Sequence, residues 1–156
     1  MTFRHEQQFP PVIWVVVADR SRSRILSAAW PNPSEWEEVA DLVHAEGALK
    51  ASEVKTDGPG TFGEVAGGHH AGQPQTDFKH QTAERFAEEI VQYLEQGRLH
   101  NKFGKLGLIC PPLFLGVLRK SLPGPLANMV TLEVDKDYTH APMKELASHL
   151  EDALNE

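Results

Sequence analysis

Seven consecutive apolar residues near the start of the sequence limit the folds open to this chain more than any other feature. The run spans residues 12–18 and reads Val-Ile-Trp-Val-Val-Val-Ala, so most of its side chains are β-branched. Such side chains favour extended backbone, and successive side chains of a strand point to opposite faces of its sheet. A strand that is apolar on both faces needs cover on both. We therefore predict a central strand in a sheet with helices on both faces.

The other elements follow from hydrophobic periodicity and turn residues. Strands are predicted at residues 12–18, 24–30, 35–43, 105–110 and 129–134. Helices are predicted from near Phe78 to Gly97 with Asp77 as the N-cap, from Leu113 to Leu122, and after Pro142. Residues 35–43 also fit a short helix, and we favour the strand. An antiparallel meander followed by βαβ crossovers predicts an α/β, Rossmann-like fold with a five-stranded mixed sheet.

The chain of 156 residues fits a single domain, which we place at residues 12–156 after a flexible tail of residues 1–11. Six of the 12 glycines lie between Gly58 and Gly72. Glycine contributes no side chain to a core and loses much conformational entropy when it is ordered. We therefore predict a mobile, glycine-rich loop at about residues 45–77.

Charge and cysteine content indicate the compartment and the class of partner. The net charge of −7 disfavours nonspecific binding to nucleic acid or to an anionic membrane, although a local basic patch can still bind phosphate. Cys110 is the single cysteine, which excludes an intramolecular disulfide and fits a reducing compartment. No run is long and apolar enough to span a membrane, and we find no signal peptide. We expect a cytoplasmic protein with no membrane partner.

Polar residues and prolines follow two strands that we expect to be neighbours. Asp19 and Arg20 follow the first strand, and Pro111 and Pro112 follow the strand that ends at Cys110. In open α/β sheets, binding sites form beyond such strand ends. Asp19 can hold a metal or orient a base, but an aspartate in a turn more often accepts backbone hydrogen bonds. Cys110 fits a nucleophile or a small buried side chain, and its apolar strand favours the second.

Three arginines alternate through the turn that follows the first strand. Guanidinium groups bind phosphate in a bidentate manner, which makes Arg20, Arg22 and Arg24 candidates for binding RNA. The same pattern fits a solvated hairpin tip, whose charged edge discourages aggregation. The sequence supports the two interpretations about equally.

Histidines in and after the glycine-rich loop invite a zinc interpretation, since imidazole and carboxylate groups bind zinc. The group comprises His69, His70, Asp77 and His80. Adjacent histidines point in different directions, and neither an HExxH motif nor paired CxxC motifs are present. We favour a polar loop and expect neither a metal nor another cofactor.

Three segments of the sequence carry a family resemblance. They are residues 14–26, with Val-Ala-Asp before the alternating arginines; residues 110–119, with Pro-Pro, Leu-Gly and Leu-Arg; and residues 133–139, with Lys-Asp-Tyr-Thr. Together they resemble the bacterial host-attachment protein family over most of residues 12–154. That family is in turn similar to the middle domain of archaeal and eukaryotic peptide-chain release factors.

The second resemblance implies a function for the end of the glycine-rich loop. In those release factors a Gly-Gly-Gln loop precedes a long helix, reaches the peptidyl-transferase centre and helps to position water. This chain has Gly72 and Gln73 in a comparable place, with Ala71 instead of the first glycine and Pro74 after the glutamine. The resemblance thus implies Gln73 as the candidate catalytic residue, and peptidyl-tRNA hydrolysis as an alternative function.

The function that we favour from the sequence is a non-enzymatic, cytoplasmic interaction module of the host-attachment family. We expect it to bind the ribosome, structured RNA or a protein partner and to act indirectly in attachment to host cells. Its candidate binding residues are Asp19, Arg20, Arg22, Arg24, Gly72, Pro111 and Pro112. A metal-dependent phosphodiesterase that uses Asp19 and the loop histidines is a third hypothesis. The oligomeric state is open.

Overall fold

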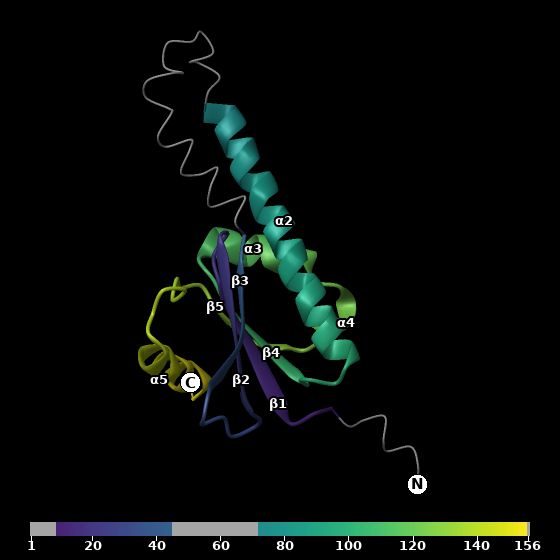
Figure 1. Cartoon of the computed structure of the whole chain (residues 1–156), viewed down its shortest axis with the longest axis vertical. Coiled ribbons are helices and arrows are strands. Elements are labelled where there is room, and N and C mark those ends of the chain that lie inside the picture. The colour runs from purple at the N-terminus through teal and green to yellow at the C-terminus, as the bar shows by residue number, and fades with distance from the viewer. Residues whose placement is uncertain (1–8, 45–71, 156) are drawn as a thin grey trace.

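The computed structural model contains a five-stranded mixed sheet (Figure 1). The strands are β1 (Val12–Ala18), β2 (Arg22–Ala29), β3 (Glu37–Val43), β4 (Lys105–Ile109) and β5 (Val130–Val134). Their order is β3-β2-β1-β4-β5, with β1 antiparallel to β2 and parallel to β4. The outer pairs follow the same pattern, since β2–β3 is antiparallel and β4–β5 is parallel. The predicted mixed sheet with a central first strand is confirmed.

The structure describes residues 9–44 and 72–155, and of residues 72–79 it describes the backbone alone. The predicted tail therefore falls largely outside the described residues, and the predicted loop does so as far as residue 71. The flexibility of the tail and the mobility of the loop stay predictions. None of the described helices is both long and apolar enough to cross a membrane.

Two apolar cores lie on opposite faces of the sheet because the side chains of β1 alternate between them. The even-numbered residues from Trp14 to Ala18 pack with the helices α2 (Gly72–Leu99), α3 (Pro112–Ser121) and α4 (Gly124–Ala127). The odd-numbered residues from Ile13 to Val17 pack with α5 (Met143–Leu154). Figure 1 shows the long helix α2 on one side of the sheet and α5 on the other. The expectation of helices on both faces is confirmed.

The start of α2 differs from the prediction. The helix begins at Gly72 instead of near Phe78, so Gly72, Gln73 and Pro74 are its first residues and Asp77 is not its N-cap. The first backbone N–H groups of a helix have no partner within it, so a proline among them costs no hydrogen bond. Pro74 is therefore compatible with the first turn, although a residue before proline usually prefers extended backbone.

The end of α2 depends on Asn101 instead of the predicted Gly97. Asn101 has a φ of 56°. Its N–H donates to the carbonyl of Arg98 at 3.0 Å, and the N–H of Lys102 donates to that of Gly97 at 2.8 Å. These two bonds form a Schellman motif, in which asparagine tolerates the left-handed conformation. Gly97 instead permits close packing, because an added Cβ would lie 2.7 Å from Cζ3 of Trp14.

Smaller differences occur at other element boundaries. β2 begins at Arg22 instead of Arg24, because its pairing with β3 extends to the partners Arg22 and Val43. β3 is a strand, as favoured, and begins at Glu37. The four-residue helix α4, which follows Pro123 and contains Pro125, was not predicted, since so short a segment shows no periodicity.

Candidate functional site

Asp19 and Pro111 follow the paired ends of β1 and β4, at the edge where the sequence predicted a site. Oδ1 of Asp19 accepts hydrogen bonds from the N–H groups of Ser21 at 2.8 Å and Arg22 at 2.9 Å, and from the Ser21 hydroxyl at 3.1 Å. These are the bonds of an aspartate that stabilises a turn. Pro111 precedes α3 and Pro112 is its first residue. A role for these residues in binding stays a prediction.

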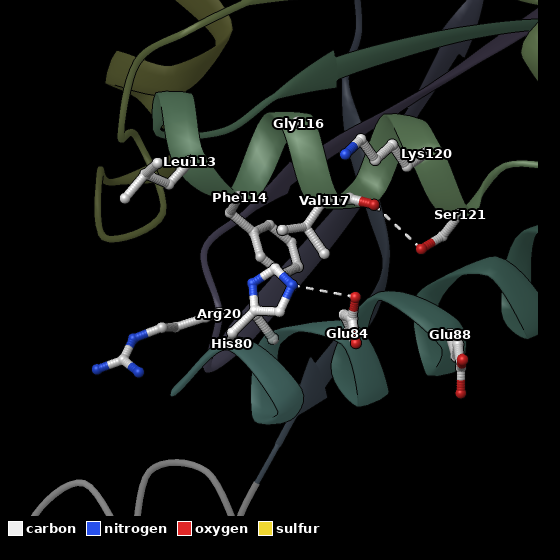
Figure 2. A pocket seen from close by; sticks show the side chains of 11 residues that line it. Arg20, His80, Glu84, Glu88, Leu113, Phe114, Gly116, Val117, Lys120 and Ser121 are labelled. Atoms are coloured by element: carbon white, nitrogen blue, oxygen red, sulfur yellow. Dashed lines mark hydrogen bonds and ion pairs between the residues drawn. The ribbon is translucent and has the colours of Figure 1, made fainter. Parts of the chain in front are cut away.

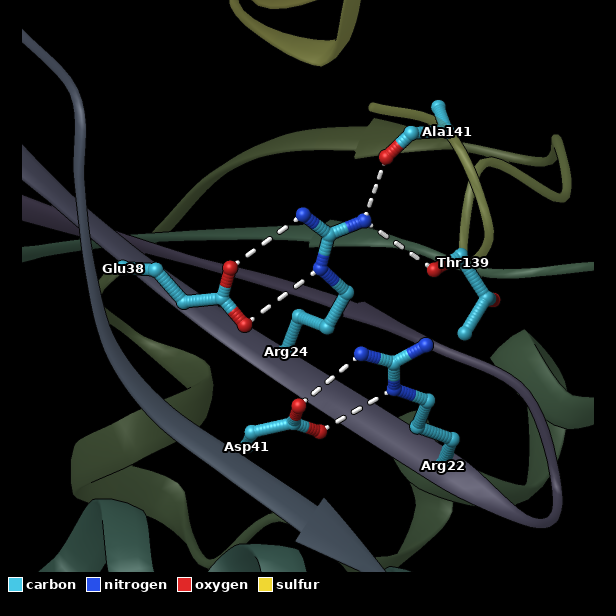
Figure 3. Close-up of polar contacts among 6 residues, drawn as sticks. All are labelled: Arg22, Arg24, Glu38, Asp41, Thr139 and Ala141. Atoms are coloured by element: carbon cyan, nitrogen blue, oxygen red, sulfur yellow. Dashed lines mark hydrogen bonds and ion pairs between the residues drawn. The ribbon is translucent and has the colours of Figure 1, made fainter. Parts of the chain in front are cut away.

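The structure does not bring the three arginines together. Arg22 and Arg24 alternate with Ser23 along β2, and Figure 3 shows them side by side. Arg24 reaches the connection that leads into α5. Arg20 lies in the β1–β2 turn and lines a groove between α2 and α3, which belong to the other face. The predicted phosphate-binding set is therefore divided between the two faces of the sheet.

Arg24 is buried and hydrogen-bonded through its whole guanidinium (Figure 3). Nε and Nη2 donate to the carboxylate of Glu38 at 3.4 and 3.2 Å. Nη1 donates to the carbonyl oxygens of Thr139 at 3.1 Å and Ala141 at 2.6 Å. Because Thr139 and Ala141 lie between β5 and α5, Arg24 joins that connection to the sheet.

Arg22 forms a second fork, with Asp41 of β3, at 3.0 and 2.9 Å (Figure 3). These hydrogen bonds lower the pKa of the Asp41 carboxyl and raise the pKa of Arg22. The two side chains are 33% and 43% exposed, so this pair is far more accessible to water than Arg24. Arg22 and Arg24 thus direct their donors to carboxylates and carbonyls of the protein itself.

Cys110, directly after β4, is buried, as favoured from the sequence. Burial raises the pKa of its thiol to about 12. The thiolate is the nucleophilic form of cysteine, so at neutral pH this thiol is protonated and inaccessible. These properties fit a small side chain of the core.

A groove of about 820 Å³ lies between α2 and α3 (Figure 2). Its lining residues are Arg20, then His80, Ala83, Glu84 and Glu88 of α2, and Leu113, Phe114, Gly116, Val117, Lys120 and Ser121 of α3. Leu113 is 88% exposed. His80 and Glu84 lie 3.1 Å apart between Nε2 and Oε2. The groove therefore has a largely apolar wall from α3 and a charged wall from α2.

Charges at the groove are only partly neutralised by their neighbours. Among the described residues, no ion pair engages Arg20, Glu88 or Lys120. Figure 2 shows Glu84 and Glu88 on the α2 side and Lys120 on the α3 side. Glu88 and Lys120 are thus available to an incoming ligand on opposite walls, while Glu84 also contacts His80.

Three rings packed beneath the surface of the groove, those of His44, Phe86 and Phe114, connect it to the sheet. The imidazole of His44, directly after β3, stacks on Phe86 of α2 with centroids 5.1 Å apart and planes inclined by 5°. Phe86 in turn contacts Phe114, which lines the groove, at a centroid distance of 6.1 Å. Nε2 of His44 lies 3.9 Å from Oε2 of Glu89. His44 therefore helps to hold α2 beside the sheet.

The sequence-predicted catalytic and zinc-ligating groups are not assembled in the described part of the chain. Gly72 and Gln73 belong to the first turn of α2, and the side chain of Gln73 lies outside the described residues. His69 and His70 also lie outside them. His80 pairs with Glu84, and no three potential metal ligands come together within the described ranges.

Sequence reasoning missed the α3 wall of the groove, although a signal was present. Residues 113–115 read Leu-Phe-Leu, and neighbouring side chains of a helix point about 100° apart. Three consecutive apolar residues therefore cannot all face the sheet. Phe114 and Leu115 are buried, and Leu113 is left at the surface. The facing wall comes from α2, which is distant in sequence, and no local pattern indicates it.

One known protein family matches nearly the whole chain. A family model described as "Protein required for attachment to host cells" matches residues 14–150. No curated protein matches the chain. The matched range contains most of the sheet and all residues that line the groove.

Proposed function

The chain belongs to the family of proteins required for attachment to host cells, and we propose that it acts there as a non-enzymatic binding module. In this proposal the groove between α2 and α3 receives a protein partner in the cytoplasm. The chain then affects attachment indirectly, through the partner that it binds. The release-factor resemblance is not needed for this function.

The exposed side chain of Leu113 carries the proposal. Full burial of a leucine side chain contributes about 1.5–3 kcal/mol, and here that contribution is left for a partner to supply. Leu113 lines the groove together with Val117 and Phe114, so it is not an isolated apolar side chain at the surface. Concave apolar surface with a few charged groups at its margin is typical of binding sites.

A non-enzymatic role is supported by the surroundings of the side chains that could act as a base, a nucleophile or a water-positioning group. Asp19 accepts three hydrogen bonds within its own turn. Cys110 is buried with a raised pKa. A release mechanism through Gln73 needs a flexible glycine hinge, whereas Gly72 and Gln73 are helical. We therefore do not propose the alternative of peptidyl-tRNA hydrolysis.

Blocking the groove tests this function directly. Gly116 lines the groove, and a Cβ built there meets no atom within 4 Å, so α3 accepts a side chain at this position and Gly116→Trp directs an indole into the groove. We expect a strain that carries this variant in place of the wild-type protein to attach to host cells no better than a deletion strain. Attached bacteria are counted on host-cell monolayers, and protein levels are measured by immunoblot.

Gly124→Trp is the matched control. Gly124 is also a helical glycine with open space around an added Cβ, and it does not line the groove. This variant should attach like the wild type. Wild-type attachment by a stably expressed Gly116→Trp protein would refute the groove as the binding site.

Binding to the ribosome or structured RNA is a second candidate, favoured by one observation. Arg20 and Lys120 are cations of the groove with no ion pair among the described residues. If both contact phosphates, Arg20→Ala combined with Lys120→Ala should lower the slope of log affinity against log salt by about 2. Co-sedimentation with ribosomes at graded salt measures this slope. Arg22→Ala is the control and should keep the wild-type slope, because Arg22 already pairs with Asp41. Equal slopes for the wild type, the double variant and Arg22→Ala would exclude binding to RNA through Arg20 and Lys120.

A further inference from the structure

We propose that the occupant of the groove is an amphipathic helix of a partner protein, with one basic flank and one acidic flank. This inference rests on the proposed function, because it names the partner chemistry of the same site. It depends on three properties of the groove: its apolar wall, its open glycine and the opposite charges of its two sides.

The apolar wall is one face of α3 that no described element covers. Leu113, Gly116, Val117 and Lys120 recur at i, i+3, i+4 and i+7, the spacing of a single helical face. The opposite face packs on the sheet through Phe114, Leu115 and Leu118. A stripe of two or three apolar side chains on a partner helix is the complement of this wall.

Gly116 lets the partner approach closely. Glycine in a helix interior is destabilising by about 0.5–1 kcal/mol relative to alanine. Packing within this chain does not require a glycine here, since nothing lies within 4 Å of an added Cβ. Its absent side chain instead leaves open space beside Leu113 and Val117, where a side chain of a partner can approach the backbone of α3.

A helical occupant is favoured over an extended one by backbone hydrogen bonding. An extended peptide binds with high affinity when it adds to the edge of a sheet. This groove is bounded by α2 and α3, so it offers no strand edge. A helix satisfies its own backbone and needs only side-chain contacts.

Charge complementarity specifies the two flanks. Glu84 and Glu88 lie one helical turn apart on the α2 side, and Lys120 lies on the α3 side (Figure 2). Basic residues of the partner, also one turn apart, match the two carboxylates, and an acidic residue on its other flank matches Lys120. An RNA ligand would place phosphates near Glu84 and Glu88, and a fully basic helix would face Lys120.

Designed peptides provide the test. The probe is a capped helical peptide of about 18 residues, with a Leu/Phe stripe, lysines on one flank and glutamates on the other. Its reference carries glutamine at every charged position. Isothermal titration calorimetry with the full-length protein should show binding of the charged probe at least about tenfold tighter than binding of the reference. Gly116→Trp should abolish binding, and Gly124→Trp should not.

Charge reversal makes the test specific. Glu84→Lys combined with Glu88→Lys should weaken binding of the probe about tenfold, because both walls then carry lysine and the lysine flank of the peptide meets like charge in either direction of binding. Adding Lys120→Glu should restore binding, because the peptide can reverse its direction and exchange its flanks. Equal affinity of the probe and the reference, or no restoration in the triple variant, would overturn the proposal.

Other occupants give different results. A groove filled by a second copy predicts a concentration-dependent dimer in light scattering that Gly116→Trp abolishes, and this result would also overturn the proposal. Failure of the peptides together with loss of attachment in Gly116→Trp refutes the charged helix and leaves the proposed function intact. Wild-type attachment by Gly116→Trp refutes the proposed function itself.

Discussion

Replacing Arg24 with alanine is expected to lower the free energy of unfolding by about 3 kcal/mol. The substitution removes four hydrogen bonds at once, two to Glu38 and one each to the carbonyls of Thr139 and Ala141. The carboxylate and the two carbonyls would then be left without these hydrogen bonds, and a buried polar group without a partner lowers stability by its desolvation free energy. The side chain of Glu38 is 28% exposed, so water can solvate part of its charge, and the expected loss is at the lower end for a broken buried pair.

Arg22→Ala is a control on the same strand. Arg22 also forms a fork with a carboxylate of β3, but both partners are well exposed, and pairs of this kind contribute about 0–1 kcal/mol. Urea unfolding followed by circular dichroism compares the two variants. If Arg22→Ala costs as much as Arg24→Ala, burial and the two carbonyl contacts are not the source of the stabilisation.

Alanine at Gly97 is expected to destabilise the protein by about 1–2 kcal/mol, although alanine is the better helix former. The added Cβ would lie 2.7 and 2.8 Å from two atoms of the Trp14 ring and 3.0 Å from Phe103. Trp14 cannot retreat easily, because its ring stacks on Phe103 at 4.6 Å and on Tyr93 at 5.8 Å. Overpacking of this kind exceeds the gain in helix propensity.

Gly116→Ala is the matched comparison and should have the opposite sign. The same substitution in α3 meets no atom within 4 Å, so only the helix propensity changes. We expect stabilisation by about 0.5–1 kcal/mol in the same unfolding experiment. Destabilisation by both alanines would show that local packing does not decide the effect.

Several features of the fold were predictable because they depend on short-range patterns. The apolar run at residues 12–18 required cover on both faces, and the structure places β1 at the centre with α2 and α5 on opposite sides. The periodic residues of α2, from Ala83 to Leu94, form its buried face. The start of α2 was less predictable, because a proline is compatible with a first turn and also with a loop.

The candidate site was only partly predictable. The sequence indicated the strand ends at Asp19 and Pro111, and Arg20 near them. It did not separate Arg20 from Arg22 and Arg24, because their division depends on where β2 begins. It did not indicate Glu84 and Glu88 as part of a site, since acidic residues on a helix surface have no distinctive local pattern.

The sequence by itself determined the class of fold, the central strand and the helical faces that pack on the sheet. These properties arise from the alternation of side chains in strands and from their recurrence in helices, and both are local. Only the tertiary structure decided that Arg24 is bound by carbonyls more than 100 residues away and that α2 and α3 enclose a groove. The physical reason is that burial and partnership depend on which elements pack together, and distant parts of the chain determine that packing.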